Sequence, residues 1–335
     1  MLISVLITGA TGFIGQHMAR ALCDREGIVR CLARKSSNVA GLKKLGVEIA
    51  YGSLEDLDAL KKAMRGTEVI YHAAGQIFAE DAALYYKVNV DGLANLVNAA
   101  AQESVQKIVH FSSSSATGPN PVRDIPVNEK SPCRPITPYG CSKLQGEQTL
   151  MALAKKYNVP IVVIRPPLVY GPGVSDSSRV LMFLKLIHKG MFRIIGHGNN
   201  LVSLCYIDNL VNGVLLAGSD SKAAGQTYFL SDARPYTINE IAEAIAREEG
   251  RQVPLPHLPL WTAGIISAAL TLPARLFGFT SPLTRNTVKE LKNSWYLDIT
   301  KARSELGYEP RVAFEEGLKK TVAWFLNDYM QAQSQ

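Results

Sequence analysis

Residues 2–15 read LISVLITGATGFIG, and this stretch decides the fold. Its apolar first half predicts a buried β-strand, and its three glycines predict a tight turn that leads directly into a helix. Such a turn lets the backbone approach a pyrophosphate, while the N–H groups and positive dipole end of the helix face the phosphates. We therefore expect this turn to bind a dinucleotide cofactor through Gly9, Thr11, Gly12, Phe13, Ile14 and Gly15.

The first half of the chain continues the alternation of strand and helix. Strands are predicted at 2–7, 29–33, 47–51, 69–72, 107–112 and 161–165, and helices at 17–24, 57–64, 90–102 and 143–157. Because the strand segments are apolar along their whole length, they indicate a parallel sheet that helices cover on both faces. The predicted fold class is α/β, a Rossmann doubly wound parallel sheet.

The second half mixes its elements less regularly. A strand is predicted at 201–207, a helix at 208–218, a helix at 238–248 with Thr237 as its N-cap, and a final helix at 314–329. We expect a cofactor-binding domain at 1–170, to which 206–235 returns. A smaller, interleaved C-terminal substrate-binding region is expected at 171–205 and 236–335.

Composition narrows the classes of function. The 335 residues are 47% hydrophobic and 19% charged, which predicts a globular protein with a large core. The five scattered cysteines form no C-x-x-C pair, so we expect a reducing cytoplasm and no metal site. The net charge of +7 comes without a run of five like charges, so no nucleic-acid partner is expected.

The end of the second predicted strand indicates which cofactor binds. An NAD site carries an acidic residue about 20 residues after the glycines, where it holds the ribose 2′-hydroxyl. This chain has Ala33-Arg34-Lys35-Ser36 instead, and the guanidinium of Arg34 suits a 2′-phosphate. The expected cofactor is NADP, with NAD left open.

A tyrosine and a lysine stand four residues apart, at Tyr139 and Lys143, where a helix begins. Side chains at this spacing share one helix face, and a nearby ammonium lowers the pKa of a phenol. The serine run 112–115 closes the fifth strand, at the edge of the sheet where such folds bind ligands. Together these residues predict acid–base chemistry on a substrate hydroxyl.

At this point the chain resembles the extended short-chain dehydrogenase/reductases, also called the NAD-dependent epimerase/dehydratase family. The resemblance rests on the glycine turn, His72-Ala73-Ala74, Asn89-Val90-Asp91-Gly92, the serine run, Tyr139-x-x-x-Lys143 and Arg165-Pro166-Pro167. It implies that Tyr139 transfers the proton, that Lys143 holds the nicotinamide ribose, and that Ser114 orients the substrate oxygen, with Ser113 as the fallback. Asn89 is expected to brace the active-site helix and strand.

The resemblance also implies further cofactor contacts. They are expected at Ser53, Leu54, Ala73, Ala74 and Pro166, and again at Tyr139 and Lys143. The family commonly has an aspartate, which contacts adenine, where this chain has Ser53. The contact at this position is therefore in doubt, while the predicted fold is unaffected.

Two branches of the family compete for the substrate. Nucleotide-sugar epimerases carry an arginine for the substrate pyrophosphate where Val202 stands, and 4,6-dehydratases carry an Asp-Glu pair where Ser115-Ala116 stands. The segment 196–209 and the end Leu306-Gly307-Tyr308-Glu309-Pro310 look more like the 3β-hydroxysteroid dehydrogenase branch. We expect an oxidoreductase that interconverts an alcohol and a ketone on a bulky, apolar, sterol-like substrate. A nucleotide-sugar epimerase or reductase is the alternative, and a dinucleotide sensor that lacks catalysis is a third.

Residues 250–289 contain no Asp or Glu, and 260–272 contain no charge at all. The uncharged part is too short to span a bilayer, which needs about 20 apolar residues. It fits either a buried lid over the substrate or a helix that lies on a membrane surface. Peripheral contact with a membrane and a homodimer are both left open.

Overall fold

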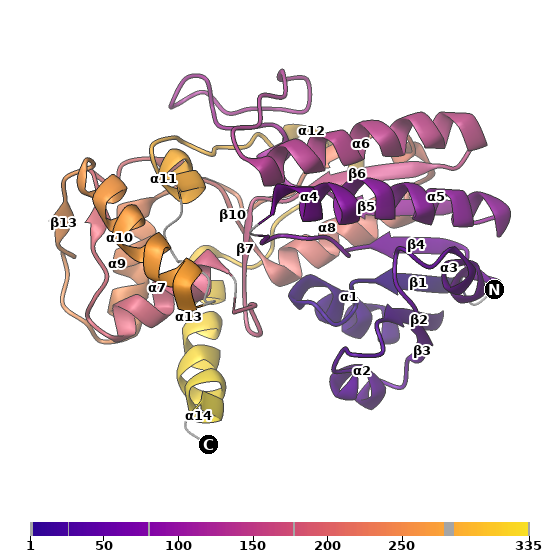
Figure 1. Ribbon diagram of the computed structural model, residues 1–335, viewed down its shortest axis with the longest axis horizontal. Coiled ribbons are helices and arrows are strands. Elements are labelled where there is room, and N and C mark those ends of the chain that lie inside the picture. The colour runs from indigo at the N-terminus through magenta and orange to yellow at the C-terminus, as the bar shows by residue number, and fades with distance from the viewer. Residues whose placement is uncertain (1–2, 26, 80, 177, 278–284, 334–335) are drawn as a thin grey trace.

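The computed structural model describes residues 3–25, 27–79, 81–176, 178–277 and 285–333, with the side chains of 270–277 and 285–287 outside that description (Figure 1). Its centre is a seven-stranded sheet in the order β11-β6-β5-β4-β1-β2-β3, in which all neighbours are parallel. The strands are β1 (Ile3–Thr8), β2 (Gly27–Ala33), β3 (Glu48–Tyr51), β4 (Val69–His72), β5 (Lys107–Phe111), β6 (Ile161–Arg165) and β11 (Thr227–Phe229). The predicted doubly wound Rossmann sheet is confirmed.

Helices cover both faces of this sheet (Figure 1). Successive side chains of each strand point to opposite faces, and because both sets are apolar, each face packs against helices. Leu6 and Ile108 point to one face, where they join a buried cluster with α3 (Leu57–Met64), α5 (Gly92–Gln102) and α6 (Pro138–Tyr157). Val5 and Ile7 point to the other face and pack with α1 (Phe13–Cys23) and α8 (Ile207–Ser219). The second cluster continues into the C-terminal part of the chain.

Short helical segments complete this half. They are α2 (Ala40–Lys44), α4 (Ala82–Tyr86), a π-helical turn (Lys87–Asp91) and the 3₁₀ turns η2 (Ser114–Ala116) and η3 (Ser221–Ala223). The π-helical turn runs directly into α5, and η2 follows β5 after two residues. The first turn therefore lies next to α5 and the second next to β5, close to the predicted site.

Most of the remaining elements gather beside the sheet, at the left of Figure 1, whereas α12 (Thr300–Leu306) packs against α8 and β11. Three two-stranded ladders lie there: β7 (Leu168–Tyr170) with β10 (Leu204–Tyr206), β9 (Leu201–Val202) with β12 (Tyr236–Thr237), and β8 (Ile194–Ile195) with β13 (His257–Leu258). The helices are α7 (Arg179–His188), α9 (Ile238–Glu248), α10 (Thr262–Phe277), α11 (Arg285–Leu291), α12 (Thr300–Leu306), α13 (Phe314–Trp324) and α14 (Met330–Gln333). Among the described residues, no helix is both long and apolar enough to cross a membrane.

Some predicted boundaries change. The strand expected at 201–207 is wrong as one element, because it breaks at Ser203 into β9 and β10, which pair in different sheets. Ser203 explains the break: its N–H donates to the carbonyl of Trp295 at 2.8 Å, and its Oγ accepts from the N–H of Leu297 at 3.0 Å. The final helix contains a π-helical turn at Phe325–Tyr329. Thr237 is confirmed as an N-cap, in a capping box with Glu240.

Candidate active site

The glycine turn brings the ends of β1 and β4 together. Gly9 has a φ of +71°, and a Cβ there would lie 2.5 Å from the backbone nitrogen of Ala74. A Cβ on Gly15 would lie 2.2 Å from the carbonyl oxygen of Gly9, so only glycine lets α1 pack against the strand. Ala73 and Ala74 therefore lie against the turn, next to the segment where the sequence places the cofactor.

The residues of this turn fit a pyrophosphate. Gly12 is the exposed N-cap of α1, and a Cβ on it would contact only the carbonyl oxygen of Gly9, at 3.3 Å. No side chain caps the helix, and its first turn holds no acidic residue. The N–H groups that begin a helix have no partner within it, so this end of α1 presents donors and positive charge to an anion. Thr11, Phe13 and Ile14 are half-buried around it.

Two cations follow β2, where the cofactor ribose is expected. Arg34 and Lys35 are exposed, and in the described part of the chain neither forms an ion pair. Across the turn, the N–H of Gly52 donates to the carbonyl of Ala33 at 3.0 Å, which places Ser53 beside the end of β2. Ser53 Oγ accepts from the N–H of Glu55 at 3.3 Å. The carbonyl of Leu54 accepts from Asn95 at 3.0 Å.

The predicted tyrosine stands in the first turn of α6. Thr137 caps this helix, its Oγ1 accepting from the N–H of Gly140 at 3.1 Å, and Pro138 fills the first position. Burial raises the pKa of Tyr139 to about 12, and the side chain of Ser113 works against this rise. The expectation that the pKa is lowered therefore differs from the structure, because burial dominates.

The two candidate serines occupy different places. Ser113 caps η2, its Oγ accepting from the N–H of Ser115 at 3.1 Å, and its side chain lowers the pKa of Tyr139 against the effect of burial. Ser114 is buried in η2, and its N–H donates to the carbonyl of Pro166 at 2.9 Å. The role of Ser114 in orienting the substrate stays a prediction, and Pro166 lies directly beside it.

Lys143 lies one turn further along α6 and is buried. Its Nζ donates to the carbonyl of Phe111, at the end of β5, at 2.7 Å. Burial lowers the pKa of Lys143 to about 8, while the carboxylate of Glu147 opposes this shift. The ammonium is therefore held at the carboxyl end of the sheet, close to the serine run.

Asn89 fastens the start of α6 to the loop after β4. Its Oδ1 accepts from the N–H of Gln76 at 2.8 Å, and its Nδ2 donates to Ser142 Oγ at 3.0 Å. A Cβ on Gly146 would lie 2.3 Å from the carbonyl oxygen of Asn89, so the glycine lets α6 approach this closely. The π-helical turn around Asn89, a distortion that is frequent at functional sites, was not predicted.

A buried ion pair that the sequence did not reveal ties α6 to β6. Arg165 donates to Glu147 through Nε at 3.0 Å and through Nη2 at 2.6 Å, and both side chains are 7% exposed. Ser112 Oγ donates to the same carboxylate, and Arg165 also reaches Thr117 Oγ1 at 3.4 Å. Glu147 and Arg165 are eighteen residues apart. No pattern of neighbouring residues in the sequence predicts an ion pair over this separation.

Two stacked histidines lie beside the candidate site, on neighbouring strands of the sheet. The rings of His72 and His110 lie 5.2 Å apart, at the ends of β4 and β5. His72 Nδ1 is 2.6 Å from Thr8 Oγ1. Burial lowers the pKa of both rings, to about 3 for His72, and the charge of Lys143 adds to this. Both rings are therefore neutral near pH 7, so neither of them adds a second positive charge beside Lys143.

Comparison with known proteins agrees with this geometry. The model of the "NAD dependent epimerase/dehydratase family" matches residues 5–230. The 2-alkyl-3-oxoalkanoate reductase of Stenotrophomonas maltophilia is 30% identical over 95% of this chain and 98% of its own. The 3 beta-hydroxysteroid dehydrogenase/Delta 5→4-isomerase of Mycobacterium tuberculosis is 27% identical over 99% and 92%.

A solved structure extends the likeness to the fold. The UDP-glucose 4-epimerase of Thermotoga maritima, determined with UDP-glucose, has a TM-score of 0.79 and 26% identity. The match covers 98% of this chain and 100% of the epimerase. These relatives include both branches that the sequence motifs leave in competition.

The buried pair predicts a large loss of stability when one partner is removed. Substituting Arg165→Met leaves Glu147 charged and unpaired, and we expect the free energy of unfolding to fall by about 3–5 kcal/mol. Urea denaturation measures this. The control is Lys320→Met, which removes the exposed pair of Lys320 with Glu316 at 2.6 Å and should cost about 1 kcal/mol or less. Equal losses in the two variants would show that the buried pair does not hold α6.

Proposed function

Because the chain belongs to the NAD dependent epimerase/dehydratase family, we propose that it is an NADP-dependent oxidoreductase that interconverts a secondary alcohol and a ketone on a bulky, apolar substrate. The position of Tyr139 one turn before Lys143 on α6, with Lys143 Nζ 2.7 Å from the carbonyl of Phe111 at the end of β5, carries the proposal. A phenol and a buried ammonium thus stand at the carboxyl end of a parallel sheet, together with a turn that fits a pyrophosphate. When bound, the cofactor supplies or accepts the hydride.

Residues of the chain transfer the proton, orient the substrate and hold the cofactor. Tyr139 protonates the carbonyl oxygen in reduction, and a pKa of about 12 keeps the phenol protonated at neutral pH. Ser113 and Ser114 orient that oxygen. Lys143, with a pKa of about 8, remains mostly charged near neutral pH and holds the nicotinamide ribose. These protonation states suit reduction of a ketone.

Support for NADP comes from the end of β2. Ala33 stands where an NAD site carries an acidic residue, and the exposed cations Arg34 and Lys35 follow it. Among the described residues the exposed guanidinium of Arg34 has no ion-pair partner, so it can bind a phosphate through two N–H groups without breaking an ion pair. This arrangement favours the 2′-phosphate of NADP over the free 2′-hydroxyl of NAD.

Support for an apolar substrate comes from β9 and from two relatives. Val202 is half-buried where the epimerase motif would carry an arginine for a pyrophosphate. Two relatives are named a 2-alkyl-3-oxoalkanoate reductase and a 3 beta-hydroxysteroid dehydrogenase/Delta 5→4-isomerase. Likeness to the UDP-glucose 4-epimerase supports the alternative, a nucleotide-sugar epimerase or reductase. Because Val202 stands where the epimerase motif carries an arginine, the epimerase alternative is weaker than the proposed oxidoreductase.

We propose further that the exposed face of α10 contacts a membrane surface. Ala263 and Ser267 are buried, whereas Trp261 and Ile265 are 71% and 61% exposed, so these two do not belong to a closed lid. The acid-free span 250–289 carries Arg251, Arg275, Arg285 and Lys289 in its sequence. Apolar side chains beside an excess of cations fit an anionic lipid surface.

The cofactor preference is tested at Arg34. We expect Arg34→Ala to raise the Kd for NADPH by about 10–100-fold, the loss of one charge-assisted bond, and to leave the Kd for NADH unchanged. Fluorescence titration of both cofactors gives the two constants. Lys43→Ala removes an exposed cation from nearby α2 and should change neither. A wild type that binds NADH as tightly as NADPH would contradict the preference.

The acid–base role is tested at Tyr139. Tyr139→Phe removes the transferable proton and keeps the ring, so kcat should fall by about 10²–10⁴-fold while the Kd for NADPH hardly changes. Tyr85 offers a matched control, because its ring lies 6.0 Å from that of Tyr139 and its hydroxyl accepts from the N–H of Ala79 at 3.0 Å. Tyr85→Phe should keep most of the activity. Full turnover by Tyr139→Phe would remove the tyrosine from the mechanism.

Membrane contact is tested by sedimentation with liposomes that contain phosphatidylglycerol. The wild type should co-sediment at low salt and less at high salt, since exposed charges are screened over about 8–10 Å in moderate salt. The double substitution Trp261→Ser with Ile265→Ser should abolish binding, and Ile28→Ser, which alters an exposed residue of β2, should not. If the wild type stays in the supernatant at low salt, α10 does not dock on lipid.

A further inference from the structure

A short extended segment, residues 294–298, connects the two halves of the chain, and the functions described so far do not use it. Trp295 in this connector pairs in parallel with Val202 of β9, and Leu297 pairs in parallel with Val127, in the loop between η2 and α6. Backbone groups of successive residues in an extended chain point to opposite edges, so one segment can pair on both sides at once. The connector therefore lies as a middle strand between β9 and the loop that follows the serine run.

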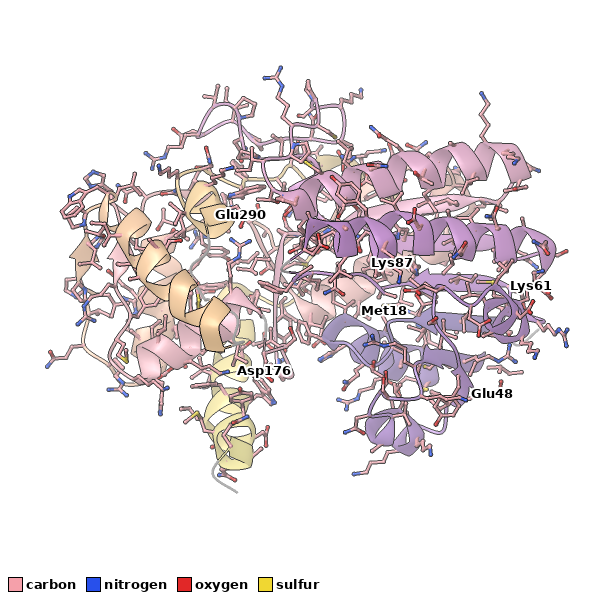
Figure 2. All side chains as sticks on the ribbon, viewed as in Figure 1. Met18, Glu48, Lys61, Lys87, Asp176 and Glu290 are labelled. Atoms are coloured by element: carbon pink, nitrogen blue, oxygen red, sulfur yellow. The ribbon has the colours of Figure 1, made fainter. Side chains whose placement is uncertain are left out.

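One edge of the connector bonds to β9. The N–H of Trp295 donates to the carbonyl of Leu201 at 2.7 Å, and the carbonyl of Trp295 accepts from the N–H of Ser203 at 2.8 Å. The N–H of Leu297 donates to Ser203 Oγ at 3.0 Å. The indole Nε1 of Trp295 also donates, at 3.2 Å, to the carbonyl of Glu290, which Figure 2 labels in α11. This edge fixes the connector to the C-terminal part of the chain.

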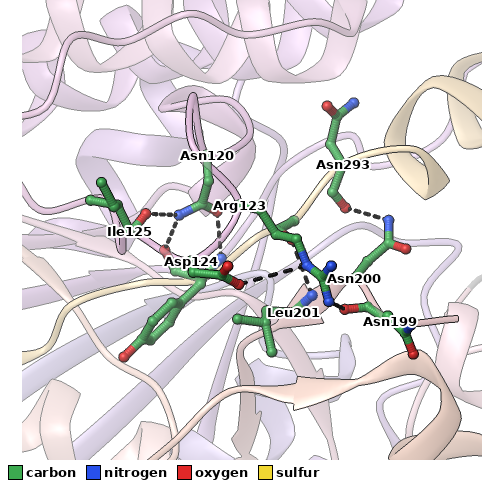
Figure 3. Close-up of polar contacts among 10 residues, drawn as sticks. Asn120, Arg123, Asp124, Ile125, Asn199, Asn200, Leu201 and Asn293 are labelled. Atoms are coloured by element: carbon green, nitrogen blue, oxygen red, sulfur yellow. Dashed lines mark hydrogen bonds and ion pairs between the residues drawn. The ribbon is translucent and has the colours of Figure 1, made fainter.

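The other edge of the connector bonds to Asn120. Asn120 Oδ1 accepts from the N–H of Tyr296 at 2.6 Å, and Asn120 Nδ2 donates to the carbonyl of Tyr296 at 2.8 Å. The same Nδ2 donates to the carbonyl of Ile125 at 2.7 Å, as Figure 3 shows, and the backbone N–H of Asn120 donates to the carbonyl of Ser294 at 3.0 Å. Asn120 is 8% exposed, so water hardly competes for these bonds. Its side-chain amide thus takes the place of a backbone amide in a strand pair.

Asn120 is linked to the serine run through Thr117. The N–H of Thr117 donates to the carbonyl of Ser114 at 3.0 Å, and the carbonyl of Thr117 accepts from the N–H of Arg134 at 2.7 Å. Thr117 Oγ1 accepts from Arg165 Nη1 at 3.4 Å. The short stretch between Ser114 and Asn120 is therefore held at both ends, and the bonds of Asn120 fix the position of β9 relative to the serine run.

We propose that Asn120 is a positioning residue that holds β9 against the serine run, so that the site selects substrates by size. The inference rests on the proposed oxidoreductase function, in which Ser113 and Ser114 orient the substrate oxygen and Val202 lies near the apolar body of the substrate. A small ketone needs only the serine run and Tyr139, whereas a bulky ketone also contacts β9. Only the bulky substrate therefore depends on the bonds of Asn120.

Turnover of two ketones of different size tests the consequence for substrates. NADPH oxidation gives kcat and KM for cyclohexanone, a single ring, and for 2-decalone, a fused bicycle. Asn120→Ala should lower kcat/KM for 2-decalone by about 10–100-fold, because a misplacement of about 1 Å costs a rate of this order. The loss should lie in kcat more than in KM, and the values for cyclohexanone should hardly change. A variant that merely folds less well would lose activity on both ketones equally.

Hydrogen–deuterium exchange tests the positioning itself and needs no reaction. Asn120→Ala removes the acceptor of the Tyr296 N–H, so exchange in the connector should become about 10–100-fold faster, as expected when hydrogen bonds of ordinary strength are lost. Exchange in β9 and in the serine run should also become faster, because the connector no longer holds them together. Strand β1, in the interior of the large sheet, should keep the exchange of the wild type.

Two further variants complete the design. Asn120→Asp keeps the acceptor for the N–H of Tyr296 and loses both donors, so it should show the same changes to a smaller degree, and it replaces Asn120→Ala if that variant does not fold. Asn128→Ala is the matched control in the same loop. Asn128 Oδ1 accepts from the N–H of Lys130 at 3.1 Å and from Ser131 Oγ at 3.3 Å, and both bonds stay within the loop. This control should keep the selectivity and the exchange of the wild type.

The outcomes separate this inference from the proposed reaction. Selective loss of 2-decalone turnover, together with faster exchange in β9 and the serine run, supports the positioning role of Asn120. Equal losses on both ketones, or faster exchange confined to the connector, would overturn it, as would wild-type selectivity in the Asn120 variants. If the wild type reduces neither ketone, the proposed reaction is contradicted, and the exchange measurement alone supports or overturns the role of Asn120.

Discussion

The bidentate pair of Glu147 and Arg165 is the interaction on which the candidate site depends, because it joins α6, the helix that carries Tyr139 and Lys143, to β6 of the sheet. Glu147 lies on α6 one turn beyond Lys143 and two turns beyond Tyr139, so its position sets theirs. Its carboxylate also favours the charged form of Lys143 against burial. One buried carboxylate thus has both a mechanical and an electrostatic effect on α6.

The site draws on both halves of the chain in different ways. The sheet supplies the glycine turn, the serine run and the N-terminal end of α1. The C-terminal part contains Val202, which we propose to lie near an apolar substrate.

Local features of this structure could be predicted from the sequence, and contacts between distant segments could not. The strands and the turn at Gly9 follow from apolar runs and glycine spacing, which act within a few residues. The choice between Ser113 and Ser114 depends on how η2 turns the chain, which counting residues does not show. The break at Ser203 arises from Trp295 and Leu297, about ninety residues away along the chain. The bonds between Asn120 and Tyr296 have the same origin.

The edge strand β11 has a consequence for how the chain is made. Residues 227–229 complete the sheet by pairing with β6, although β6 ends at Arg165. While a ribosome synthesises the intervening residues, the edge of β6 has no partner strand from its own sheet. An unpaired parallel edge attracts other strands, so a nascent chain of this kind is most exposed to aggregation in that interval.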